Sequence, residues 1–200
     1  SLDKELSEYE QVFMNPEVEQ SLISKNELLA SFAISKAEDS QLTLGEAQDV
    51  YKLLIADPAY DFMAKKLKMK QKLTQKDHDK LEFFNIAKAF RLLNQTPFSF
   101  KDLTPGLIAD IHGQITRGLD VFAKYLPDFT VYKAGVWRDN DLIRVGGYIP
   151  APAEQIGSGV KELIAYVETH QSVTGVAVFH TALYALHPFN NGNKRVCRIL

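Results

Sequence analysis

The sequence predicts a mainly α-helical protein in which one short β-hairpin interrupts a bundle of several helices. Apolar residues recur at the helical period over most of the 200 residues. Helix-capping residues stand where several of these patterns begin. β-Branched and aromatic residues gather around a polar tip only between Thr130 and Pro150. These three observations define the expected architecture.

Residues 1–73 are expected to form a helical extension that packs on the rest of the chain. Apolar stripes predict two helices, the first through Leu6, Tyr9 and Phe13 and the second through Val18, Leu22, Leu29 and Ala33. Thr43 and Glu46 have the spacing of a capping box, which predicts a helix running through Leu54. Pro58 is expected to start the next helix.

Residues 74–200 are expected to form the core, with a soft boundary near Thr74. Thr74 and Asp77 repeat the cap pattern before a helix that ends at the Gln95–Pro97 stretch, and Thr104 with Pro105 begins another. The hairpin follows, with Asp139–Asp141 as its tip, and it must lie on other elements because two isolated strands are marginally stable. Two more helices are predicted between Ile156 and Leu186.

Composition excludes several classes of protein. The 46% hydrophobic content suffices for a core, and 23 basic against 25 acidic residues leave a net charge of −2, too small to attract nucleic acid or anionic lipid globally. A single cysteine, Cys197, cannot form an intrachain disulfide, and no stretch resembles a membrane span. We therefore expect a soluble, cytoplasmic protein with no membrane partner, leaving a secreted effector role open.

The stretch from His187 to Arg198 carries the functional prediction. Pro188 disfavours helical geometry at His187, so a helix should end there and leave the imidazole at the edge of a loop. Asn190, Asn191 and Gly192 suit a tight turn, after which Asn193 can restart a helix whose N-terminus favours an anion. Arg195 and Arg198 lie three residues apart, on one helical face. A histidine beside a phosphate site suits general base catalysis of phosphoryl transfer.

These residues resemble the motif of the Fic (filamentation induced by cyclic AMP) family. That motif is His, Pro, Phe, any residue, Asp or Glu, Gly, Asn, Gly or Lys, Arg, two residues, Arg. Eight of its nine specified positions match in HPFNNGNKRVCR, and the exception is Asn191. Ile111 with His112, the Val136–Val145 segment, Tyr148–Pro152 and Phe179 with His180 occur in the order that the family shows. The resemblance covers roughly Thr74 to Leu200.

The resemblance implies a helical protein nucleotidyltransferase that moves AMP from ATP onto a Ser, Thr or Tyr hydroxyl of a target protein or of itself. His187 would deprotonate the hydroxyl. Gly192, Asn193 and Lys194 would form the backbone anion site, Arg195 the main phosphate contact and Arg198 the γ-phosphate contact. The hairpin would be the family's flap, with Trp137 and Ile143 as candidate clamping side chains.

Asn191 stands where the family has the acidic residue that holds Mg²⁺. An amide oxygen without charge is a weaker Mg²⁺ ligand than a carboxylate, so metal binding should weaken. Three outcomes remain open: a slow AMP transferase, an enzyme with another nucleotide donor, and a nucleotide-binding or partner-binding relative with little catalysis.

Other segments support weaker interpretations. Ser35–Ser40 is a poor match to the family's inhibitory motif; Asp39 or Glu38 could reach Arg198, but an exposed acidic helix end is the preferred interpretation. The lysine run from Lys65 to Lys76 lacks interleaved aromatic residues, so nucleic-acid binding is not expected. Only eight residues follow Gly192, and relatives continue further, so we expect the core to be incomplete beyond Leu200.

Overall fold

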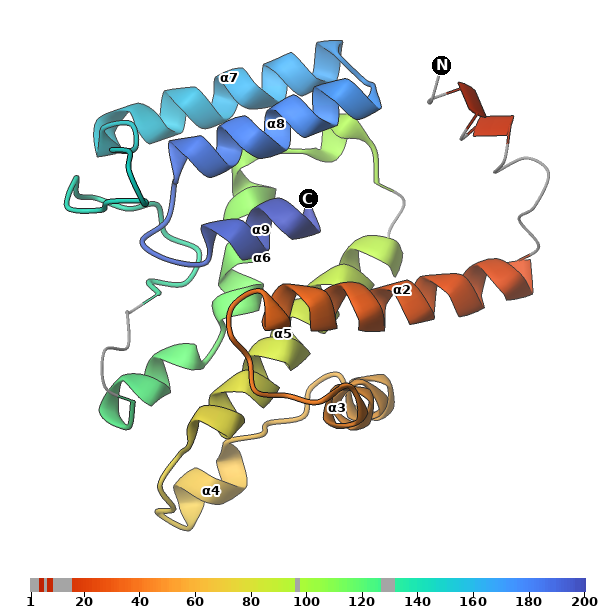
Figure 1. Ribbon diagram of the computed structural model, residues 1–200, viewed down its shortest axis with the longest axis vertical. Coiled ribbons are helices and arrows are strands. Elements are labelled where there is room, and N and C mark those ends of the chain that lie inside the picture. The colour runs from red at the N-terminus through yellow and green to blue at the C-terminus, as the bar shows by residue number, and fades with distance from the viewer. Residues whose placement is uncertain (1–3, 6, 9–15, 96–97, 127–131) are drawn as a thin grey trace.

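The computed structural model describes residues 4–5, 7–8, 16–95, 98–126 and 132–200. The mainly α-helical prediction is confirmed (Figure 1). The helices are α2 (Pro16–Lys36), α3 (Leu44–Ala56), α4 (Ala64–Lys68), α5 (Gln75–Gln95), α6 (Pro105–Thr116), α7 (Ile156–Thr169), α8 (Val173–Leu186) and α9 (Asn193–Ile199). Short 3-10 turns are η1 (Phe100–Asp102), η2 (Leu119–Lys124) and η3 (Ala153–Gln155). The predicted helix through Leu6, Tyr9 and Phe13 lies outside the described residues.

Local capping explains where three of these helices begin. The Thr43 hydroxyl accepts a bond from the Glu46 amide at 3.3 Å, and the Glu46 carboxylate accepts one from the Thr43 amide at 3.0 Å. Thr74 and Asp77 exchange the same pair of bonds at 3.3 and 2.9 Å. The Thr104 hydroxyl accepts from the Leu107 amide at 3.0 Å. Each cap satisfies amides that would otherwise lack partners in the first helical turn.

The expected helix start at Pro58 is wrong. Residues 57–63 form turns, and α4 begins only at Ala64. Asp57 accepts a bond from the Ala59 amide at 3.0 Å, which closes a local turn instead of a helix. Asp61 then accepts from the Met63 and Ala64 amides at 2.8 and 3.0 Å. The Asp61 carboxylate thus binds the amides at the beginning of α4, whose N-cap residue is Met63.

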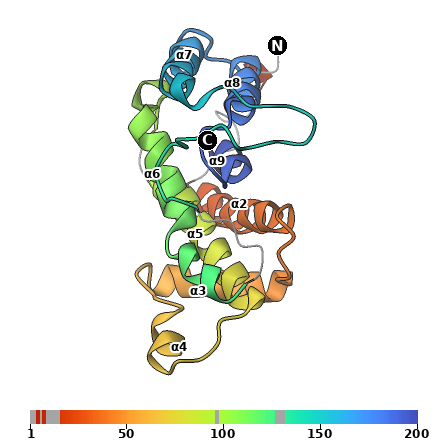
Figure 2. The same ribbon diagram turned by 90° about the vertical axis from the view of Figure 1, so that its left-hand side faces the viewer.

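Helix α5 is the central element of the fold. Helices α2 and α3 pack against it, as do α6 and α9. The division into an extension and a core near Thr74 stays a prediction. Helices α7 and α8 run side by side at the top of Figure 1, with α9 beneath them, and the turned view of Figure 2 places α4 at the opposite end of the molecule. No helix in the described ranges is both long and apolar enough to cross a bilayer.

One hydrophobic cluster joins the helices that surround the His187–Arg198 stretch. It includes Ile108 from α6, Val160 from α7, Leu183 from α8, Val196 from α9 and the fully buried Phe189 from the connecting loop. Cys197 lies in the same cluster. The loop between α8 and α9 is thus anchored by its own apolar side chain, which holds the polar residues around it in fixed positions.

The predicted β-hairpin does not form paired strands in the described part of residues 130–150. A single antiparallel bridge joins Val145 and Tyr148, and the rest of residues 132–152 is loop. Arginine side chains take backbone carbonyls that strands would use: Arg138 binds those of Asn140 and Ala151, and Arg144 binds those of Asp141 and Ile143. The β-branched residues therefore belong to a loop held by side chains.

Candidate active site

His187 lies where the sequence places it, at the end of a helix. Helix α8 ends at Leu186, and His187 adopts the left-handed conformation with φ of 51° and ψ of 61°. This backbone region is unusual for a residue with a side chain, and the following proline disfavours the helical alternative. The chain therefore turns sharply at His187 and enters the loop that leads to α9.

His187 lines an open pocket of about 670 Å³ together with Ile143, Asn191 and Lys194. The remaining lining residues are Arg144, Val145, Gly146, Tyr148, Tyr184 and Asn190. Four of the predicted site residues thus meet at one pocket, between the loop after α8 and the 143–148 segment. Its volume lies within the range of sites for small molecules and cofactors.

The imidazole of His187 is neutral at physiological pH. Burial, followed by the positive charges of Arg138 and Lys194, lowers the pKa of His187 to about 4. The Nδ1 atom is buried and has no hydrogen-bond partner among the described residues. A neutral imidazole can accept a proton, although a base with so low a pKa accepts it less readily than one poised near 7.

The loop between His187 and α9 is held by two side chains, that of Asn193 at the start of α9 and that of His112 on α6. Asn193 closes it from within, because its amide donates to the Phe189 carbonyl at 2.8 Å and its oxygen accepts from the Phe189 amide at 2.9 Å. His112 stacks on the Phe189 ring with centroids 3.7 Å apart. Asn193 is buried, so its side chain stabilises the loop and does not face the pocket.

His112 also joins the backbone of two loops, at Gly135 and at the pocket-lining Asn191. Its Nδ1 accepts a bond from the Gly135 amide at 2.9 Å, so Nε2 carries the proton that it donates to the Asn191 carbonyl, 3.0 Å away. Burial lowers the pKa of His112 to about 4, which keeps this neutral form. Gly192, at φ of 79°, packs against the same ring, where a Cβ atom would lie 3.3 Å from it.

Arg195 is buried in an ion-pair network and is only 3% exposed. Its guanidinium donates to the Glu82 carboxylate at 2.6 Å, lies 3.3 Å from the Tyr132 hydroxyl and reaches Asn191 Oδ1 at 3.4 Å. Burial raises the pKa of Glu82 against the attraction of this guanidinium. The sequence interpretation gave Arg195 the main phosphate contact; that role stays a prediction, since in this structure the guanidinium already has partners.

Glu38 lies between the two arginines of α9. One of its carboxylate oxygens is 3.6 Å from Arg195 and the other is 3.7 Å from Arg198. Glu38 stands in the turn after α2, so the N-terminal extension places an acidic side chain on the predicted phosphate-binding residues. The sequence interpretation preferred an exposed acidic helix end; instead, the carboxylate of Glu38 contacts both cations.

Asn191 offers poor geometry for a metal ion. Its side-chain oxygen accepts a bond from the Gly192 amide at 2.7 Å and faces the Arg195 guanidinium. In the described ranges, no cluster of three or more His, Cys, Asp or Glu side chains could hold a metal ion. A neutral oxygen already used by two donors does not fit the preference of Mg²⁺ for ionised ligands.

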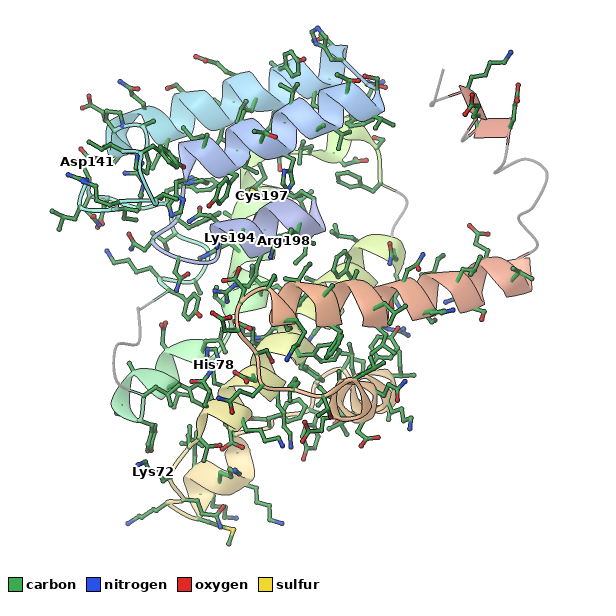
Figure 3. All side chains as sticks on the ribbon, in the orientation of Figure 1. Lys72, His78, Asp141, Lys194, Cys197 and Arg198 are labelled. Carbon is green, nitrogen blue, oxygen red and sulfur yellow. The ribbon has the colours of Figure 1, made fainter. Side chains whose placement is uncertain are left out.

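The remaining predicted residues lie around the pocket. Arg198 is 37% exposed and lies on α9 with Lys194, as Figure 3 shows. Trp137 packs against Phe189, with ring centroids 4.7 Å apart, and therefore belongs to the core side of the loop. In the lysine run, Lys66 pairs with Asp77 and Lys76 with Glu46. Lys72 of the same run lies at the α4 end of the molecule in Figure 3, away from Lys194 and Arg198.

Four residues that contact the site were missed or undervalued by sequence reasoning: Glu38, Glu82, His112 and Arg138. Each acts through partners distant in sequence; Glu82 and Arg195, for example, are 113 residues apart. The useful signal was a charged residue within an otherwise apolar pattern, which Glu82 on α5 and Arg138 beside Trp137 both provide.

The site combines a histidine at the end of one helix, a tight loop, and two arginines on the next helix. It lies within a helical bundle. Residues 102–200 match the model of the Fic/DOC family. The solved structure of a Fic family protein from Desulfovibrio desulfuricans G20 is similar in fold, with a TM-score of 0.59 and 17% sequence identity. The alignment covers 96% of this chain and 50% of that one. No match was found among curated proteins.

The chain belongs to the Fic/DOC family through its domain at residues 102–200. It spans about half the length of the solved relative. Members of this family commonly transfer AMP, and the resemblance seen in the sequence motif is thereby confirmed at the level of family and fold.

Proposed function

We propose that this chain is a protein nucleotidyltransferase that transfers AMP from ATP to a hydroxyl of a target protein or of itself. The observation that carries the proposal is the common pocket of His187, Asn191 and Lys194, next to the loop segment of Ile143. In the proposed reaction the hydroxyl oxygen attacks the α-phosphorus and gives its proton to His187. The bond from the α-phosphorus to the bridging oxygen breaks, and pyrophosphate leaves.

The charges of the pocket support a phosphate-bearing substrate. Lys194 and Arg144 line it, and no acidic side chain from the described residues does. Arg198 is partly exposed nearby and could take a further phosphate once Glu38 moves away. We propose that Glu38 holds the site in a latent state, because its carboxylate contacts the same two arginines that the family resemblance assigns to phosphate binding.

The test is self-labelling and lysate labelling with ATP, GTP, UTP and CTP, each labelled on the α-phosphate. It compares the wild type, Glu38→Gln and Glu38→Gln/His187→Ala. We expect labelling that increases in Glu38→Gln and disappears with His187→Ala. Labelling absent from all proteins with all four nucleotides, or unchanged by His187→Ala, would refute the proposed transfer.

A second candidate is a nucleotide-binding module with little catalysis. Asn191 favours it, because this residue replaces the expected carboxylate and its oxygen already accepts two bonds. Calorimetry distinguishes the candidates: nucleotide binding that is indifferent to Mg²⁺, together with no labelling after Asn191→Asp, would support the binding module. Labelling that appears in Asn191→Asp would support an enzyme weakened at this position.

A further inference from the structure

Arg138 uses all three of its guanidinium nitrogens in hydrogen bonds, and the family motif does not include it. The residue is 3% exposed, although it belongs to the loop between η2 and η3. A buried arginine needs partners for most of its donors, since an unpaired buried charge is strongly destabilising. The positions of those partners show what the guanidinium holds in place.

One end of Arg138 binds the turn at His187. The backbone amide of Arg138 donates to the Pro188 carbonyl at 2.8 Å, and its Nε donates to the His187 carbonyl, also at 2.8 Å. These bonds join consecutive carbonyls at the point where the chain adopts left-handed geometry. They therefore stabilise the backbone conformation that presents the imidazole to the pocket.

The other end of Arg138 closes its own loop. One terminal nitrogen donates to the Asn140 carbonyl at 2.8 Å and to the Asp141 carboxylate at 3.2 Å, and the second donates to the Ala151 carbonyl. Asp141 also accepts a bond from the Ala153 amide at 2.7 Å. The two ends of the 139–151 segment thus meet at one guanidinium, and the pocket-lining residue Ile143 lies between them.

The imidazole of His187 has few other contacts that could orient it. Its Nδ1 is buried without a partner in the described ranges, so no carboxylate holds the ring as in a catalytic triad. Tyr184 contacts the ring only edge-on, with centroids 6.2 Å apart. The direction of the imidazole therefore depends on the backbone of His187, and Arg138 binds that backbone.

We infer that Arg138 is a positioning residue: its guanidinium holds the His187 backbone and the 139–151 segment in one arrangement, so that the proton acceptor and the pocket wall opposite it are set together. The role of Arg138 in nucleotide transfer rests on the proposed function. Its structural part can be measured without turnover, because it concerns the orientation of His187 and the closure of the loop.

The experiment compares Arg138→Lys, Arg138→Met and Asp141→Ala with a matched control, Asp139→Ala. The control removes an exposed carboxylate of the same loop that pairs with Lys133 at 3.0 Å and does not bind Arg138. The first readout is trypsin cleavage after Arg144, followed by mass spectrometry. The second is the NMR signal and titration of the His187 imidazole, assigned with His187→Gln. Thermal unfolding shows whether each variant is folded.

We expect cleavage after Arg144 to accelerate about tenfold in Arg138→Lys and in Asp141→Ala, since both lose charge-assisted hydrogen bonds that close the loop. The His187 signal should shift in Arg138→Lys but stay near the wild-type position in Asp141→Ala, because only the former loses the bond from Nε to the His187 carbonyl. In Arg138→Met the pKa of His187 should also rise, since one of the two nearby cations is gone while Lys194 remains.

The inference is overturned if Arg138→Lys leaves both the cleavage rate and the His187 signal at wild-type values. It is also overturned if Asp139→Ala changes them as much as Arg138→Lys does. Labelling by the same proteins tests the transfer separately: absence of labelling from the wild type and from Glu38→Gln would refute the proposed function, whereas the cleavage and NMR results would still decide whether Arg138 positions His187.

Discussion

Replacing Glu38 by glutamine should increase the affinity of this chain for ATP. The carboxylate of Glu38 lies 3.6 Å from Arg195 and 3.7 Å from Arg198, so a phosphate group must compete with it for these cations. Glutamine keeps the size and the hydrogen-bonding oxygen of the side chain but removes the charge. The substitution therefore tests electrostatic competition with little change in packing.

The size of the effect follows from the surroundings of the two pairs. Two unit charges at about 4 Å interact by about 4 kcal/mol at an effective dielectric constant of 20, which sets an upper limit for each contact. Arg198 is partly exposed, and exposed pairs contribute about 1 kcal/mol or less. Arg195 is already neutralised by Glu82. A net gain of about 1–2 kcal/mol remains, which lowers the Kd for ATP by a factor of about 5–30.

Isothermal titration calorimetry with ATP, with and without Mg²⁺, measures this change. The matched control is Asp39→Asn, because Asp39 is the neighbouring acid and asparagine tolerates its positive φ of 63°. We expect wild-type affinity from the control and loss of the gain in Glu38→Gln/Arg198→Gln. Equal affinities for the wild type and Glu38→Gln, or an equal gain from Asp39→Asn, would show that Glu38 does not compete with phosphate.

Two further predictions concern buried titratable side chains, His112 and Glu82. The folded pKa of His112 is about 4 against an ordinary value of 6.5, so the unfolded chain binds more protons between these values and stability falls as the pH falls through that window. Urea denaturation should show a loss of about 3 kcal/mol from His112 by pH 4. A His112→Asn variant with the same pH dependence as the wild type would contradict this. Glu82→Gln should cost about 3 kcal/mol in chemical denaturation, because it leaves Arg195 buried without its closest carboxylate. Glu46→Gln, at a more exposed pair, should cost clearly less, and equal losses would contradict the assigned difference.

Local features of the fold could be predicted because they depend on residues close in sequence. The caps at Thr43, Thr74 and Thr104 lie where expected, since each hydroxyl binds an amide three residues away. The turn at His187 was predictable for the same reason, because Pro188 acts on the residue directly before it. Such interactions are encoded within a few residues and do not require knowledge of the packing.

Residues 132–150 were wrongly predicted to form a hairpin, because the hydrogen bonds that hold them do not all join residues close in sequence. β-Branched and aromatic residues such as Val136, Trp137 and Ile143 suggest strands, yet Arg138 takes backbone carbonyls from both ends of the segment and from the turn at His187. The contacts of Glu38 and Glu82 with Arg195 could not be predicted either, because α2 and α9 must both pack on α5 before these charges come together. Periodicity gives the faces of helices, and it does not give the identity of the charge that each face meets.

Burial of the single cysteine makes this chain convenient for spectroscopy. Cys197 is 4% exposed, and burial raises the pKa of its thiol to about 12, so almost no reactive thiolate exists at neutral pH. A cysteine introduced in place of Leu142, whose side chain is 86% exposed, would then be the main target of a maleimide dye. A fluorophore attached there could follow the 139–151 segment in real time while nucleotide is added, without first removing the native thiol.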